Sequence, residues 1–129
     1  MKSRKKFLGR YVMQDVLMHI YFDPDSAAGG DAHFAWHKDG FVRVTIGGKD
    51  HTWGEVLGTA LHELLEISFR LSKASFSPDF NLLQRRDTGR FRFFMDHDQF
   101  TEAVQHVAYV MVFLAPDLSA AYNKKEKAK

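Results

Sequence analysis

The stretch "LGTALHELLEISFRL", residues 57–71, carries side chains that could bind a metal ion. His62 and Glu66 are four residues apart, so on a helix they share one face and can reach the same ion. Glu63 is turned about 100° away from His62, which suits a group that contacts metal-bound water. This is the arrangement of the His-Glu-x-x-His zinc motif, with glutamate in place of the second histidine. The stretch therefore indicates a divalent-metal site, and the competing interpretation is an ordinary solvated His-Glu pair on the polar face of a helix.

A catalytic zinc ion usually has three protein ligands and one open position, so a third ligand is required. The segment "FMDHDQF", residues 94–100, concentrates three candidates, Asp96, His97 and Asp98. His97 would complete a set of two histidines and one glutamate, which is a known catalytic zinc set. Asp96 or Asp98 would instead give an acid-rich set that favours zinc less. Either aspartate could also serve only as the N-cap of a helix.

The helix that carries the motif is expected to run from about residue 53 to residue 72. Thr52 is a suitable N-cap, and Glu55 follows three residues later, as in a capping box. Small and apolar residues then recur at helical spacing. The candidate metal-site residues fall in the polar gap that remains on the helical wheel. The face expected to pack against a sheet consists of residues 57, 61, 64, 65 and 68.

Three strands are expected ahead of this helix. Residues 15–22, "DVLMHIYF", form a short continuous apolar run that ends at an Asp-Pro pair, which is typical of a buried strand. Residues 33–37 and 41–46 are predicted to form a hairpin, because an Asp-Gly turn stands between them.

A long connection and a second helix complete the expected fold. Residues 72–91 show no regular pattern, and loops of this length are often functional or mobile. The second helix is expected to begin near residues 96–98 and to end near Leu114, since Pro116 lies just beyond. This order predicts a small α+β domain in which about three strands pack on the motif helix and on a C-terminal helix.

The bulk properties fit a single domain over residues 1–129. Hydrophobic residues make up 45% of the chain, which is enough for a buried core. There is no cysteine, so a metal site must use His, Asp or Glu. We expect a cytoplasmic protein without a membrane partner, because neither a membrane-spanning apolar run nor a signal peptide is evident. The basic ends, about residues 1–10 and 120–129, are expected to be solvated and frayed.

A second kind of chemistry is carried by "RRDTGRFRFF", residues 85–94. Arginines beside phenylalanines suit contacts with a nucleic-acid backbone and stacking on its bases. The competing interpretation, a surface loop whose phenylalanines anchor it in the core, is favoured. We therefore do not expect a nucleic-acid partner. The residues that such a partner would contact are Arg85, Arg86, Arg90 and Arg92.

The segments "VRVTIGGKDHTWGEVLGTALHELLEISF" and "MDHDQFTEAVQHVA" resemble the small zincin-like metallopeptidases of bacteria and bacteriophages. The resemblance covers about residues 41–114, and it departs from the family at Glu66, where the second motif histidine would stand. It implies a zincin-like fold, with one of residues 96–98 as third metal ligand. It also implies that His62 is a metal ligand and Glu63 the general base. The positions that fit the motif are Trp53, Glu55, Val56, Leu57, Leu61, His62, Glu63, Leu64 and Leu65.

The resulting hypothesis is a zinc-dependent metallopeptidase that hydrolyses a peptide or protein substrate with metal-activated water. Another divalent metal is the alternative cofactor, because glutamate is a harder ligand than histidine. Residues 41–46 would pair with an extended substrate as an added strand. The competing hypothesis is an inactive zincin-like scaffold with a protein-binding or structural role, since a fold does not fix a function. The glutamate at position 66 favours that alternative.

Overall fold

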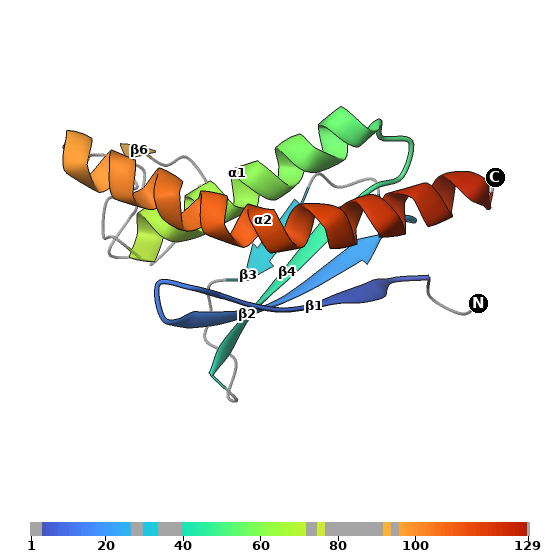
Figure 1. Ribbon diagram of the computed structural model, residues 1–129, viewed down its shortest axis with the longest axis horizontal. Coiled ribbons are helices and arrows are strands. Elements are labelled where there is room, and N and C mark those ends of the chain that lie inside the picture. Colours follow the sequence, from blue (N-terminus) through green and yellow to red (C-terminus); the bar gives the residue numbers. More distant parts are fainter. Residues whose placement is uncertain are drawn as a thin grey trace, which may run out of the picture.

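The computed structural model of the protein describes residues 4–26, 30–33, 40–71, 75–76, 92–93 and 96–128. Two helices lie on one side of a four-stranded sheet (Figure 1). This arrangement confirms the small α+β domain that the sequence predicts. The elements in chain order are β1 (Lys6–Met13), β2 (Val16–Asp23), β3 (Gly30–His33), β4 (Phe41–Gly47), α1 (Trp53–Leu71), β5 (Ser75–Phe76), β6 (Arg92–Phe93) and α2 (His97–Lys127).

The sheet has the strand order β1-β2-β4-β3. β2 and β4 pair in parallel, whereas β1 pairs antiparallel with β2, and β3 antiparallel with β4. The strand expected at 15–22 is confirmed as β2. The expected antiparallel pairing with residues 41–46 is confirmed, but the described partner strand is β3 at 30–33, and residues 34–37 of the predicted strand lie outside the described ranges. The prediction that a substrate pairs with residues 41–46 is wrong, because β2 and β3 already occupy both edges of β4.

β1 corrects the expectation of a frayed basic end for residues 6–10, and residues 1–3 lie outside the described ranges. A bulge between Phe7 and Gly9 shifts the register, so the alternation of side chains that marks a strand is interrupted. Gln14 and Asp15 connect β1 to β2 with φ angles of 52° and 64°. Positive φ at both central residues is typical of the type I′ hairpin turn, for which Asn-Gly is the usual sequence signal. The Gln-Asp pair carries no such signal.

The core lies between the sheet and the two helices. Along β2 the buried residues alternate with half-buried ones, and Met18, Ile20 and Phe22 are at most 1% exposed. Burial of a side chain of this size stabilises the fold by about 1.5–3 kcal/mol. The helices contribute to the same cluster through Val56, Ala60, Leu64, Ile67, Val107, Val110, Leu114, Leu118 and Ala121.

The start of α1 agrees with the sequence analysis. The hydroxyl of Thr52 accepts a hydrogen bond from the backbone N–H of Glu55 at 3.2 Å. The same hydroxyl donates to the Glu55 carboxylate, also at 3.2 Å. The Val56 N–H donates to the Thr52 carbonyl at 3.0 Å, which begins the helical ladder. Thr52 is therefore the N-cap that the sequence predicts.

The buried face of α1 is rotated from the expected one. Leu64 and Ser68 are buried as expected, but Leu61 is 38% exposed and residues 57 and 65 are only half-buried. α1 packs against α2 as well as against β3 and β4, and the second helix turns a different set of residues inward. That set consists of Val56, Ala60, Glu63, Leu64, Ile67 and Ser68.

α2 continues past its expected end. A stop near Leu114 is wrong, because the helix runs through Pro116 to Lys127. A proline inside a helix removes one hydrogen bond and costs about 3 kcal/mol. Leu114 and Leu118, on either side of the proline, are both 0% exposed, and burial of each stabilises the fold by about 1.5–3 kcal/mol. Their burial offsets the proline, so residues 120–127 are helical and not frayed.

α2 also exposes an apolar strip. Tyr109, Val112 and Phe113 are 73%, 66% and 69% exposed. Within the described ranges, α2 is the one helix that is long and apolar enough to cross a membrane, which the sequence analysis did not expect. A single such helix is weak evidence for a span. Its other side packs in the core through Val107 and Val110.

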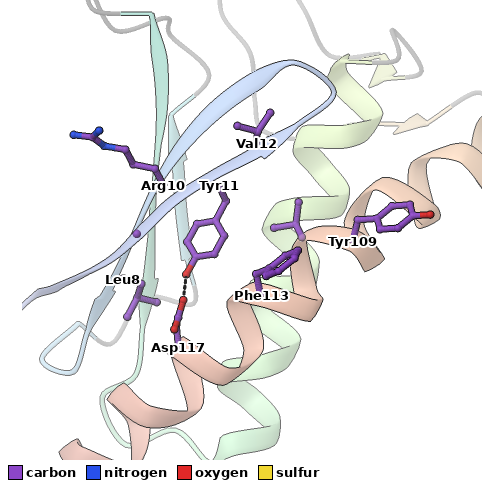
Figure 2. Close-up of a pocket in the computed structure, with 9 residues that line it drawn as sticks. Leu8, Arg10, Tyr11, Val12, Tyr109, Phe113 and Asp117 are labelled. Carbon is purple, nitrogen blue, oxygen red and sulfur yellow. Dashed lines mark hydrogen bonds between the residues drawn. The ribbon is translucent and has the colours of Figure 1, made fainter.

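α2 lies beside β1, the outer strand on one side of the sheet. Tyr11 of β1 points toward α2 and donates a hydrogen bond to Asp117 at 2.5 Å (Figure 2). Leu8, Val12 and Phe113 are among the residues that line a groove of about 440 Å³ around this bond. Burial of the hydroxyl, together with the bond to the Asp117 carboxylate, raises the pKa of Tyr11 above its usual range. The hydroxyl therefore stays protonated at neutral pH and ties α2 to the sheet.

The turn between β4 and α1 is held by a close contact and a buried lysine. A Cβ placed on Gly48 would lie 2.4 Å from the ring of Phe22. The Gly48 N–H donates to the carbonyl of Asp23 at 2.9 Å. The Gly48 carbonyl accepts a hydrogen bond from Nζ of Lys125 at 2.7 Å. Lys125 is only 7% exposed, although the sequence analysis places it in a frayed end. The end of the sheet and the last turn of α2 therefore meet at one glycine.

Gly48→Ala is expected to lower the free energy of unfolding by about 1–3 kcal/mol, because the added methyl group overlaps the buried ring of Phe22. Gly58→Ala is the matched control. A Cβ at Gly58 in α1 would meet no atom within 4 Å, so alanine there should stabilise the helix by about 0.5–1 kcal/mol. Urea unfolding followed by circular dichroism measures both changes. If the two substitutions changed the free energy of unfolding equally, the contact between Gly48 and the Phe22 ring would not be what requires glycine at position 48.

Tyr11→Phe is expected to lower the free energy of unfolding by about 1–2 kcal/mol at neutral pH, because the Asp117 carboxylate loses its donor. Since folding raises the Tyr11 pKa, the bond contributes fully below the unfolded tyrosine pKa of about 10 and is lost as the pH rises further. Urea titrations below and above a pH of about 10 measure this effect. As the pH rises, the free energy of unfolding should fall less in Tyr11→Phe than in the wild type. Tyr109→Phe, at a residue that is 73% exposed, is the control that should change neither quantity.

Candidate metal centre

His62, Glu63 and Glu66 bring one imidazole and two carboxylates together on α1. One ligand atom from each residue lies within 4.8 Å of the other two. The His62 side chain is 70% exposed and that of Glu66 is 25% exposed, whereas Glu63 is buried. The helical spacing predicted for His62 and Glu66 thus brings them together at the protein surface. In the ranges that the structure describes, this is the one group of three such residues close enough to share an ion.

The separation of His62 and Glu66 suits a shared ion. Nε2 of His62 lies 3.5 Å from Oε2 of Glu66. Two ligands bound to one zinc ion at about 2.1 Å in a tetrahedral arrangement lie roughly 3.4 Å apart. An imidazole with a carboxylate suits zinc, and a further carboxylate makes the set more acceptable to manganese. The separation of the pair is therefore compatible with two ligands on one divalent cation.

Glu63 reaches the group from the side of the core. It is 7% exposed and lies on the buried arc with Ala60, Leu64 and Ile67, which corrects its expected place in the polar gap. A buried carboxylate is stable only with a polar or charged partner, and Glu63 has such an interaction. Core packing holds this carboxylate beside the exposed His62. A role as general base remains a prediction.

Arg70 belongs to the site, although the sequence analysis assigns it no role. Nη2 of Arg70 lies 3.4 Å from Oε1 of Glu66, while the other carboxylate oxygen faces His62. The spacing of four residues between Glu66 and Arg70 is the signal that could have predicted this pair. An arginine next to a carboxylate offsets its negative charge, so Arg70 competes with a cation for Glu66.

Asp96, His97 and Asp98 are not part of the close group on α1, and the role of one of them as third ligand stays a prediction. Asp96 is the N-cap of α2: its carboxylate accepts from the Gln99 N–H at 2.8 Å, and the Gln99 side chain accepts from the Asp96 N–H at 3.0 Å. Nδ1 of His97 lies 3.5 Å from the hydroxyl of Thr101 in the next turn. The capping box therefore accounts for Asp96 at this point of the sequence.

The candidate nucleic-acid residues are only partly described. Arg85, Arg86 and Arg90 lie outside the described ranges. Arg92 belongs to β6, which pairs antiparallel with β5. The connection expected to be irregular over residues 72–91 thus includes one short strand, and a second strand follows it. Contact of the 85–94 segment with nucleic acid stays untested.

Comparisons of this chain with models of protein families, with curated proteins and with solved structures give no match. The case for a metal centre rests on the geometry of α1. His62 and Glu66 stand at the separation of two ligands on one ion, and Glu63 lies beside them.

Arg70→Gln is expected to tighten zinc binding roughly tenfold, because removal of the guanidinium leaves the full negative charge of Glu66 for the ion. Isothermal titration of the purified protein with zinc measures the affinity. Arg43→Gln, which removes an exposed arginine on β4, is the control and should leave the affinity unchanged. An unchanged affinity in Arg70→Gln would show that Glu66 does not bind the ion.

Proposed function

We propose that the protein is a metal-dependent peptidase whose centre is the group of His62, Glu63 and Glu66 on α1. The observation that carries this proposal is the 3.5 Å separation of His62 Nε2 and Glu66 Oε2, with a carboxylate oxygen of Glu63 in the same group. Zinc is the proposed ion, because imidazole and carboxylate are both among its ligands in hydrolases.

The three residues divide between holding the ion and moving a proton. When bound, zinc polarises a substrate carbonyl and lowers the pKa of a coordinated water from about 15.7 to near 7. His62 and Glu66 would hold the ion from adjacent turns of the helix. Glu63 accepts the proton of the attacking water on its carboxylate and then donates it to the amine that leaves as the peptide bond breaks. Because Glu63 is packed in the core, little reorganisation accompanies the transfer.

The outer strand next to α1 supports a peptide as the substrate. β3 ends the sheet beyond β4, so one edge of its backbone lies outside the four-stranded ladder. α1 packs against β3, which brings the helix of the metal group alongside this strand (Figure 1). An extended peptide could add to β3 through backbone hydrogen bonds, as in other cases of strand addition. This edge replaces β4, the strand proposed from the sequence.

The ion pair between Glu66 and Arg70 favours a second candidate, a scaffold of the same fold without catalysis. The 3.4 Å contact occupies one oxygen of Glu66, and residues 96–98 do not complete the ligand set. In this alternative Glu66 and Arg70 form a structural pair on a partly exposed helix face. Such pairs contribute at most about 1 kcal/mol to stability. The scaffold would act by binding a protein.

Three substitutions separate the two candidates. Glu66→Ala should weaken zinc binding by about 100-fold or more, because it removes a direct ligand. Glu63→Gln should retain zinc and the fold but abolish peptide hydrolysis, because the amide cannot accept the proton of the water. Glu66→His restores the common motif and should tighten zinc binding. Metal analysis, zinc titration and cleavage of a fluorescent casein measure the three outcomes.

The scaffold candidate gives a different pattern for the same proteins. The wild type would contain no metal after purification without chelators, and Glu66→His would gain no zinc affinity. Glu63→Gln would then alter only stability, which circular dichroism detects. This pattern would refute the peptidase.

A further inference from the structure

The face of the sheet opposite the helices is rich in aromatic side chains. Pairing in the sheet places Phe7 across from Tyr21, and both belong to this face. The ring of Phe7 lies 5.2 Å from that of Tyr21 and 5.7 Å from that of His19. His19 stacks on Phe41 of β4 at 3.9 Å, with 13° between the ring planes. The rings therefore form one continuous row across β1, β2 and β4.

Positive charges surround this row. Nζ of Lys5 lies 4.9 Å from the centre of the Tyr21 ring, and the guanidinium of Arg43 lies 5.8 Å from it. Arg10 and Arg43 are both register partners of His19, so they belong to the same face. All three cations are exposed, which makes this side of the sheet basic.

A hollow continues the basic surface toward the end of α2. Its volume is about 590 Å³, and its lining includes Lys5, Lys6, Phe7 and Lys124. Phe7 belongs to the row of rings and also lines this hollow, and it is 45% exposed. An exposed aromatic ring among cations, on a sheet face that neither described helix covers, has the character of a binding surface.

We propose that this face binds single-stranded nucleic acid. Bases stack on Phe7 and Tyr21, and the phosphates contact Lys5, Arg10 and Arg43. A duplex buries the faces of its bases, so the exposed ring of Phe7 favours a single strand. A second copy of the chain would bring like charges together, which argues against self-association through this face. The surface lies on the other side of the sheet from α1, so it is independent of the proposed metal centre.

Fluorescence anisotropy with a labelled oligouridylate tests the proposal on the full chain. Binding at low salt is expected, with a dissociation constant in the micromolar range. Phe7→Ala should weaken binding about tenfold, because one stacking ring is lost. Phe113→Ala, at an aromatic residue that is 69% exposed on α2, is the matched control and should bind as the wild type does.

The salt dependence tests the charges separately. Arg43→Gln should reduce the slope of log affinity against log salt by about 0.7, the value for one phosphate contact with a single strand. Arg43→Lys keeps the charge and should keep the slope. Circular dichroism of each variant confirms that the fold is retained.

Four outcomes would overturn the proposal. The first is equal binding of an RNA duplex of the same length, and the second is equal competition by poly-glutamate. The third is an unchanged affinity in Phe7→Ala. The fourth is a dimer of the wild type in sedimentation that Phe7→Ala dissociates, because the face would then be an interface between copies.

Discussion

The lack of a side chain at Gly48 is the constraint on which the arrangement of sheet and helices depends. The ring of Phe22 fills the space that a Cβ would need, and the backbone of Gly48 bonds to both β2 and Lys125 of α2. Four residues later Thr52 caps α1. The position of α1, which packs against β3, follows from this junction. Within α1, the helix itself sets the relation of His62, Glu63 and Glu66 to one another.

Much of the fold could be predicted because its signals are local. The apolar run of β2 and the cap of α1 each depend on a few neighbouring residues. β1 could not be predicted, because a bulge after Phe7 interrupts its alternation and its turn contains no glycine. The end of α2 could not be predicted either, because here a local signal was present but was overridden. Pro116 is a strong local stop signal, but the burial of Leu114 and Leu118 on both sides overrides it.

The candidate site also has a part that could be predicted from the sequence and a part that could not. The pairing of His62 with Glu66 could be predicted, since a spacing of four residues fixes their relation on any helix. The burial of Glu63 could not, because it depends on how α1 packs against the rest of the fold. The aspartate and histidine cluster near residue 97 resembled a source of ligands, but ligands and helix caps use the same residue types. Only the three-dimensional arrangement distinguishes the two roles.

The parallel pairing of β2 with β4 has a consequence for how the chain assembles. β1 and β2 form a local hairpin, which can close within microseconds. β4 must then enter between β2 and β3, although β3 precedes it in the chain. The simplest route is for β3 and β4 to form their own hairpin and dock as a unit. During synthesis, the apolar face of β2 stays uncovered until both helices have emerged, and the bond of Lys125 to Gly48 requires the last turns of α2. The nascent chain therefore depends on α2 to complete its fold.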